Sequence, residues 1–139
     1  RDNSPIQTTA ELAGLVREAY GPRAASSRNH PATRTFQALR IAVNDELGAL
    51  DGLLRQVEEA AKAIAEGRST WLAPGARVVF LTFHSLEDRL VKRAFAALAR
   101  RRLGTVPART PMTPSEQEIG INPRSRSAKL RVATVGGPS

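Results

Sequence analysis

A cluster of titratable side chains follows directly after an apolar stretch of the sequence. The segment VVFLTFHSLEDR runs from Val78 to Arg89, and the six residues before its histidine are apolar apart from one threonine. Such a run is typical of a strand that is buried on both faces. Open α/β sheets bind ligands at the carboxyl ends of their strands, so we predict that His84 and Ser85 are catalytic residues at such an end.

A helix is predicted to begin at this cluster. Ser85 and Asp88 have capping-box spacing, and the backbone N–H groups at a helix start attract anions. Arg89 and Lys92 follow, where they could anchor phosphates. Two simpler interpretations stay open: Ser85 only caps the helix, and Glu87 and the acid after it only complement the helix dipole. The predicted buried face consists of Leu86, Leu90, Val91, Ala94, Phe95 and Leu98.

The composition favours a polyanionic partner. Lys plus Arg is 21 against 13 Asp plus Glu in 139 residues, which gives a formal net charge of +8. Nucleic acid is therefore a better candidate than a membrane surface, although a merely solvated basic surface is the alternative. The absence of cysteine excludes disulfides and thiolate chemistry, and two histidines argue against a His-based metal site. No stretch resembles a membrane span or a signal peptide, so we expect a cytoplasmic protein without a membrane partner.

A second polar face is predicted on a helix whose first residue is Pro31. Its members are spaced four, three and four residues apart and so share one side of the helix: Thr33, Gln37, Arg40 and Asn44. Such a face can bind unstacked RNA through Arg and Asn side chains, or it can form a hydrogen-bonded seam between domains. His30 and Arg34, at the start of the helix, are expected to reach a phosphate.

The other elements are predicted from caps and periodicity. The first helix starts at a capping box of Thr8 and Glu11 and ends at Gly21. The second helix carries an apolar stripe, and glycines at 48 and 52 predict a break before a third helix capped by Asp51. The apolar positions of the second helix are Phe36, Leu39, Val43, Leu47 and Leu50. In the proline-rich tail we expect one helical turn capped by Thr113, then a half-exposed strand in the segment AKLRVATV.

Helix, turn, strand, sharp turn and helix is the order of an α/β protein with a parallel sheet. One buried strand needs neighbours on both edges, and the C-terminal strand is the only other partner in this chain. We therefore expect the chain to lack the front part of its fold. The sequence also begins at Arg1 without a methionine.

Three segments of the sequence resemble a known family. They are HPATRTFQALRIAVNDEL (His30 to Leu47), LTFHSLEDRLVKRAF (Leu81 to Phe95) and NPRSRSAKLRVA (Asn122 to Ala133). Together with PIQTTAELAGLV near the start, they resemble the C-terminal part of the MraW/RsmH family, bacterial methyltransferases that act on a cytosine N4 in small-subunit (16S) ribosomal RNA. The resemblance covers nearly the whole chain and is weakest over 60–70 and 104–111.

The resemblance implies an α/β fold: the late strands and helices of a partial Rossmann-like methyltransferase sheet, with part of a helical insert domain. Residues 1–50 would belong to the insert, which is the candidate for RNA recognition, and residues 51–139 to the methyltransferase domain. It also implies S-adenosylmethionine as cofactor and 16S ribosomal RNA or the small ribosomal subunit as partner. Whether the molecule forms a homodimer stays open.

The sequence departs from this family in one respect. It contains no glycine-rich loop after a first strand, so no cofactor ligand can be assigned here and the cofactor site is expected upstream. We expect the isolated chain to be inactive and not to bind S-adenosylmethionine. A non-catalytic basic RNA-binding module is the alternative function.

Within the methyltransferase interpretation, the candidate residues acquire roles. His84 would hydrogen-bond a flipped cytosine or its phosphate, because orientation supplies much of the rate of methyl transfer to an amine. The tail segment NPRSRSAK resembles a phosphate-binding loop, in which Arg124, Arg126 and Lys129 would contact RNA.

Overall fold

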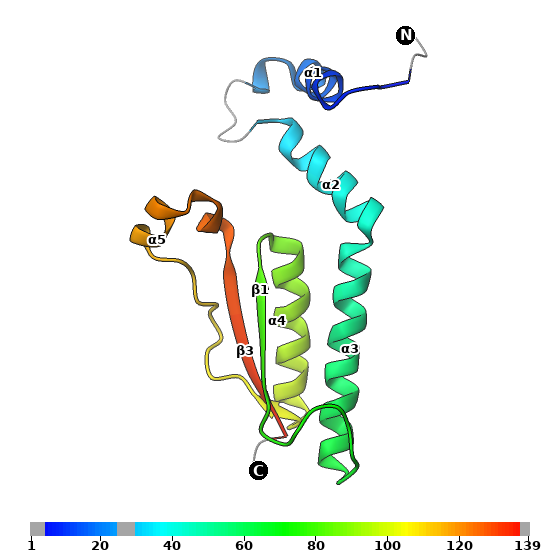
Figure 1. Cartoon of the computed structure of the whole chain (residues 1–139), viewed down its shortest axis with the longest axis vertical. Helices are drawn as coiled ribbons and strands as arrows, with labels where there is room; N and C mark the ends of the chain where they lie inside the picture. The colour runs from blue at the N-terminus through cyan, green and yellow to red at the C-terminus, as the bar shows by residue number, and fades with distance from the viewer. Residues whose placement is uncertain (1–4, 25–29, 137–139) are drawn as a thin grey trace. The chain divides into compact units, whose positions relative to one another are not determined.

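The computed structural model describes residues 5–24 and 30–136, which fall into two compact units. One unit extends to Glu46 and the other begins at Leu47. Figure 1 labels the main elements. In chain order they are α1 (Thr9–Tyr20), η1 (Gly21–Ala24), α2 (Ala32–Asn44), α3 (Glu46–Ala65), β1 (Arg77–Thr82), α4 (Ser85–Arg100), β2 (Gly104–Thr105), α5 (Glu116–Ile121), η2 (Pro123–Ser127) and β3 (Lys129–Val135).

The capping box predicted for α1 is confirmed. The Thr8 hydroxyl accepts a hydrogen bond from the Glu11 backbone N–H at 3.1 Å, and the Glu11 carboxylate accepts one from the Thr8 N–H at 3.1 Å. The helix ends at Gly21, whose φ of 54° lies in the region that a residue with a Cβ rarely adopts. Both ends of this helix could therefore be predicted from local chemistry.

The break between α2 and α3 does not lie where the glycines predicted it. It lies at Asp45, which has a left-handed conformation (φ 47°, ψ 39°) that Asp tolerates better than most residues. α3 then runs unbroken through Gly48 and Gly52, and Asp51 pairs with Arg55 instead of capping a helix. Burial of its later residues in the core outweighs the low helix propensity of the two glycines.

The predicted details of α2 are corrected in two places. Pro31 takes the N-cap position, so the first helical residue is Ala32. The apolar stripe is only partly covered, because Val43 is 81% exposed and Leu39 is 46% exposed. A stripe at helical spacing thus predicted the helix correctly without predicting how much of it would be buried.

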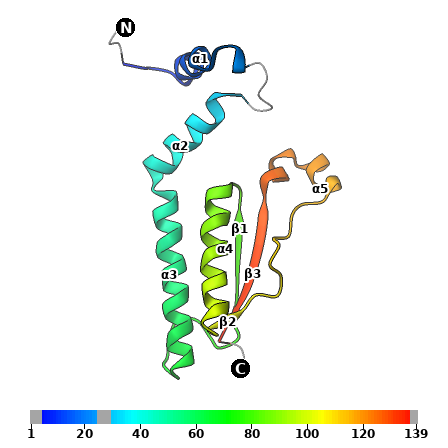
Figure 2. The ribbon, with the colours of Figure 1, turned by 180° about the vertical axis from the view of Figure 1, so that it is seen from behind.

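The sheet is antiparallel and has the strand order β1-β3-β2, so the prediction of parallel pairing is wrong for these strands. The C-terminal strand does pair with β1, as expected. Since β1 and β2 both run antiparallel to β3, they are parallel to each other, and α4 connects them in strand–helix–strand order. The parallel signal was real, but β3 lies between the two strands (Figure 2).

β1 is buried on one face only, which corrects the prediction of burial on both. The register places Phe80 opposite Arg131 on the face covered by α4, and it places Leu81 opposite Leu130 on the other face. Leu81 is 55% exposed and its neighbour Val79 is 54% exposed. This second face is called the open sheet face below, and its members are Val79, Leu81, Leu130 and Val132.

The core lies between the sheet, α4 and α3. Its buried members are Leu54, Val57, Ala61, Val91, Phe95, Leu98, Ala133 and Val135. The Phe80 and Phe95 rings meet edge to face with centroids 5.8 Å apart, and an ion pair between Arg101 and Glu58 joins α4 to α3. Leu86, predicted for the buried face of α4, is instead 40% exposed.

Close backbone approach fixes β2. A Cβ on Gly104 would lie 2.5 Å from the Thr134 carbonyl oxygen, so only glycine fits this pairing.

The helical turn predicted in the tail is α5, but its cap is Ser115 and not Thr113. β3 alternates between buried and half-buried residues, as predicted. In the part of the chain that the structure describes, no helix has the length and apolar character needed to cross a membrane.

We predict opposite outcomes for two adjacent residues of β1. Phe80→Ala should lower the free energy of unfolding by about 2 to 4 kcal/mol, because it removes the ring that packs on Phe95. Leu81→Ala, on the open sheet face, should cost less than about 1 kcal/mol. Urea unfolding followed by circular dichroism measures both, and equal losses would contradict the assignment of the two faces.

Candidate functional site

The antiparallel pairing brings two predicted groups of residues to one end of the sheet. β1 ends where β3 begins, so His84 and Ser85 after β1 share this end with η2 before β3 (Figure 1). The Thr82 hydroxyl donates a hydrogen bond to the Lys129 carbonyl at 3.3 Å across the junction. We call this region the β1 end. It collects His84, Ser85, Arg89, Arg124 and Arg126 from segments about forty residues apart.

His84, not Ser85, caps α4. Its Nδ1 accepts a hydrogen bond from the Glu87 backbone N–H at 3.3 Å, and the Glu87 carboxylate accepts bonds from the N–H groups of Phe83 and His84 at 2.9 and 3.2 Å. The capping box therefore starts one residue earlier than predicted, and Ser85 is the first helical residue. Histidine is an uncommon cap, so the serine was the natural expectation.

The ring of His84 is held from both sides. Its side chain is 9% exposed, and Nε2 lies 3.3 Å from a Glu87 carboxylate oxygen without the geometry of a hydrogen bond. Because Nδ1 accepts a bond, the proton of the neutral ring belongs on Nε2. The structure thus presents one imidazole N–H donor whose hydrogen-bonding capacity is not used within the described residues.

A buried ion pair lies beneath the β1 end. Asp88 and Arg131 are 8% and 9% exposed, and the guanidinium donates two hydrogen bonds to the carboxylate, at 2.7 and 3.2 Å. Lys129 adds a third contact at 3.5 Å, and Arg131 also donates to the Arg109 carbonyl at 2.9 Å. One side chain therefore joins α4, β3 and the loop after β2.

Sequence reasoning missed this pair, although a signal was present. Asp88 lies in helical register with Val91 and Phe95, and Arg131 alternates with Ala133 on the inward side of β3. One acid in an apolar helix stripe and one base at an inward strand position predict a buried pair. The capping-box spacing of Ser85 and Asp88 instead favours a cap or dipole role for Asp88.

The pair changes the acidity of its carboxyl group. Hydrogen bonds from Arg131 lower the pKa of Asp88 from its ordinary value, against the opposing effect of burial, and the charges of Arg131 and Lys129 act in the same direction as the hydrogen bonds. Asp88 therefore stays ionised well into the acidic range, and its charge is neutralised within the fold.

The segment predicted to bind phosphate forms an exposed basic turn at η2, and phosphate binding there stays a prediction. The Asn122 side chain accepts a hydrogen bond from the Arg124 N–H at 3.3 Å, and Ser125 is buried with its hydroxyl donating to the Asn122 carbonyl. Arg124 and Arg126, on either side of it, are exposed. Lys129 is engaged with Asp88, so it is less available to a phosphate than predicted.

The candidates on α2 lie in the first unit and are described separately. Arg40 pairs with Glu46 at 2.9 Å, and the Asn44 amide donates to the same carboxylate at 3.4 Å. His30 accepts a hydrogen bond from the Ala32 N–H through Nδ1, while Arg34 is exposed. Half of the predicted polar face is thus occupied by a local, exposed ion pair of small energetic value.

The described residues do not fit the cofactor that the resemblance implies. β1 passes straight into the helix capped by His84, with no glycine-rich turn for a nucleotide-like ligand. The cavity beside Phe95 is lined by four basic side chains and no carboxylate, which does not suit a cationic sulfonium or ribose hydroxyl groups. No chemical step through that cofactor is assigned to these residues.

The geometry suits the binding of a polyanion better than independent catalysis. Arg89, Arg124 and Arg126 are exposed, and their side chains form no hydrogen bond or ion pair within the ranges 5–24 and 30–136. They come from segments that lie, like His84, at the β1 end of the sheet. Such a site can hold phosphates and orient one polar group of a ligand.

The chain is similar over most of its length to known proteins. A sequence profile of the MraW methylase family matches residues 1–135. The chain is 47% identical to the ribosomal RNA small subunit methyltransferase H of Paenibacillus sp. (strain JDR-2) over 96% of its own length and 43% of that protein. It is 56% identical to the protein of the same name from Synechococcus sp. (strain CC9311), over 90% of this chain and 36% of the relative. The chain thus spans about two fifths of these curated relatives.

We predict an acid-dependent loss of stability that traces to Asp88. Its lowered pKa means that the pair stabilises the fold above the unfolded value of about 3.9 and that this contribution is lost as the pH falls through the folded pKa. Asp88→Asn should therefore cost about 3 to 5 kcal/mol at pH 7, because Arg131 remains buried without its counter-charge.

The measurement is urea unfolding of both chains between about pH 7 and pH 3. The unchanged chain should lose stability below about pH 4, and the variant should lose less over that interval. Asp51→Asn, which breaks an exposed pair with Arg55, is the matched control and should cost less than about 1 kcal/mol. An identical acid profile in Asp88→Asn and the unchanged chain would contradict the prediction.

Proposed function

The chain belongs to the MraW methylase family, and from this premise we propose that it forms the C-terminal portion of an S-adenosylmethionine-dependent methyltransferase of 16S ribosomal RNA. The proposed product is a cytosine methylated on N4 within the small ribosomal subunit. The observation that carries the proposal is the 47% identity to a small subunit methyltransferase over 96% of the chain. The cytoplasm, where ribosomes assemble, is the proposed location.

The open sheet face supports the proposal that this chain is one portion of a larger enzyme. Val79 and Leu81 expose large apolar side chains on the face that α4 does not cover. Adjacent exposed apolar residues on a sheet commonly mark a surface that another element covers. We propose that the remaining part of the methyltransferase domain covers this face and carries the cofactor, which supplies the methyl group.

The two compact units support a division of labour within the chain. Their boundary at Glu46 and Leu47 lies close to residue 50, where we assign the change from helical insert to methyltransferase domain. In this assignment His30, Arg34, Arg40 and Asn44 contribute RNA contacts from the insert. Arg40 and Asn44 would exchange their contact with Glu46 for RNA on binding.

At the β1 end, we propose that His84 orients the target base. The Nε2 donor of His84 is buried and has no hydrogen-bond partner among the described residues. In this proposal, RNA binding exposes it to a cytosine that has left the base stack, while the exposed Arg89, Arg124 and Arg126 hold adjacent phosphates. Ser85, at the first position of α4, would present its hydroxyl and N–H to the same nucleotide. Precise orientation of the amine is the main contribution that protein side chains make to such a transfer.

A non-catalytic RNA-binding module is the second candidate. It is favoured by the exposed arginines of η2. Only the methyltransferase proposal predicts that methylated cytosine is formed.

The deciding experiment uses the complete coding sequence of the protein. The purified product is incubated with undermethylated small ribosomal subunits and labelled S-adenosylmethionine, and the RNA is digested to nucleosides for mass spectrometry. We expect label in N4-methylcytidine. RNA binding without any labelled nucleoside would favour the second candidate, and label in another nucleoside would contradict the proposed specificity.

The role of His84 is tested by two substitutions in the complete enzyme. His84→Ser keeps an N-cap but removes the imidazole, whereas His84→Ala removes both. We expect each to lower turnover at least about tenfold, because each loses an orienting contact. Only His84→Ala should also lose about 1 kcal/mol of stability. Full turnover in His84→Ser would show that the histidine serves only as a cap.

A further inference from the structure

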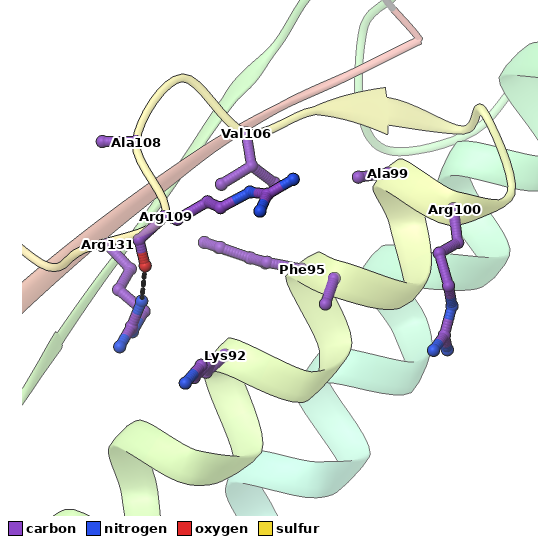
Figure 3. A pocket seen from close by; sticks show the side chains of 9 residues that line it. Lys92, Phe95, Ala99, Arg100, Val106, Ala108, Arg109 and Arg131 are labelled. Carbon is purple, nitrogen blue, oxygen red and sulfur yellow. Dashed lines mark hydrogen bonds between the residues drawn. The ribbon is translucent and has the colours of Figure 1, made fainter.

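A cavity of about 410 Å³ lies on the second unit, away from the β1 end. It is formed by one face of α4, by the loop that follows β2 and by Arg131 of β3 (Figure 3). Its volume is within the range of small-molecule sites in proteins. Of the residues that line it, only Lys92 is among those predicted above to bind RNA.

The floor of the cavity is apolar and its shape is set by short side chains. Phe95 is 2% exposed and is held by its contact with the Phe80 ring, so it forms a fixed base. Ala96 and Ala99 lie one helical turn apart on the same face of α4, and both are exposed. Val106 lies across the cavity from the helix (Figure 3). A flat ligand could rest on this floor without moving the core.

The rim is basic throughout. Lys92, Arg100 and Arg109 are exposed, and their side chains have no ion pair or hydrogen bond within the described part of the chain. Arg131 is different, since Asp88 neutralises it and its bond to the Arg109 carbonyl fixes the loop. No acidic residue lines the cavity. The exposed cations therefore favour an anionic ligand, and the buried Arg131 holds the wall in place.

A nucleotide combines the two properties that this cavity complements. Its base is a flat, largely apolar surface, and its phosphate is an anion joined to it. Arginine side chains also stack on bases, and Figure 3 shows the Arg109 side chain extending over the cavity toward Val106. A phospholipid also joins an apolar part to a phosphate, but its acyl chains lack the flat face on which the Arg109 side chain could stack.

We propose that this cavity binds one unstacked nucleotide of the ribosomal RNA, with its base over Ala96 and Ala99 and its phosphate between Lys92 and Arg109. The inference rests on the proposed function, because that function supplies the RNA. Position 96 lies twelve residues beyond His84, which is about 18 Å along the helix axis. The bound nucleotide is therefore a flanking one, not the methylated cytosine, and it helps to select the sequence context.

The test is the affinity of the chain for a short fluorescein-labelled single-stranded RNA, measured by anisotropy at several salt concentrations. Ala96→Phe fills the cavity from an exposed position and should weaken binding about tenfold or more, the effect of losing one stacked base. Arg109→Gln should weaken binding and flatten the salt dependence by about 0.7 in log–log slope. Arg93→Gln is the matched control, since Arg93 is an exposed cation of α4 outside the cavity, and should change affinity by less than about twofold.

Unchanged affinity in Ala96→Phe, with an unchanged melting temperature, would overturn the proposal. An equal loss in Arg93→Gln and Arg109→Gln would also overturn it, because the effect would then be general charge. Free cytidine monophosphate is the second probe, followed by the amide NMR signals of Ala96, Ala99 and Ala108. Shifts with the RNA support the proposal; shifts with the mononucleotide and none with the RNA would overturn the assignment to RNA.

The experiments distinguish failure of the cavity proposal from failure of the proposed function. If the complete enzyme forms N4-methylcytidine and Ala96→Phe has unchanged kcat/KM and RNA affinity, the cavity proposal falls and the function stands. If no methylated cytosine forms but Ala96→Phe still weakens RNA binding, the cavity stands and the enzymatic proposal falls.

Discussion

The buried pair of Asp88 and Arg131 is the interaction on which the arrangement of the second unit depends. Apolar packing can place α4 on the sheet, but it does not fix the helix against sliding or rotation. A guanidinium that donates two bonds to one carboxylate allows few relative positions. The same guanidinium holds the Arg109 carbonyl, so the register of helix, strand and loop is set at one point. A buried pair is weak evidence of net stability, so we assign this one to fixing the relative position of helix, strand and loop.

Both candidate surfaces take their geometry from this point. Toward the N-terminus of α4, the pair and Lys129 keep the start of β3 beside the capped helix, so η2 lies at the same end of the sheet as His84. Toward its C-terminus, the loop held by Arg131 forms a wall of the basic cavity. Neutralising Arg131 internally also leaves the positive charge of the surface to side chains that are exposed. The fold thus separates cations that organise the structure from cations that are available to a ligand.

Sequence reasoning succeeded where the determining interactions are local. The capping box at Thr8 and Glu11, the strand before His84 and the helix after it all follow from neighbours within a few residues. Sequence reasoning failed where contacts between segments distant in the sequence determine the structure. The direction of β3, the exposure of Leu81 and the role of Asp88 depend on residues about forty positions away. Gly48 and Gly52 show the same limit, since core burial overrides their weak helix propensity.

The residues of the candidate site could be predicted from the sequence better than their structural roles could. His84 was selected for its place after a strand, yet no local rule indicated that its ring would cap the helix, because serine is the far commoner cap. Arg124 and Arg126 were correctly expected at an exposed turn, whereas Lys129 was drawn into the ion pair. The cavity beside Phe95 could not be predicted at all. It arises from three segments that meet only when β3 is in place.

The position of β3 in the sheet has a consequence for the synthesis of the protein. It is the last strand in the chain and the middle strand of the sheet, so β1 and β2 have no partner in this sheet until the residues up to Val135 have left the ribosome. During translation, α3 and α4 can form as helices, but β1 has no β3 to pair with until Lys129–Val135 has been made. Such non-local closure is slow and exposes strand edges to other nascent chains. A nonsense codon before β3 would therefore remove the strand that joins β1 to β2, so this three-stranded sheet could not form.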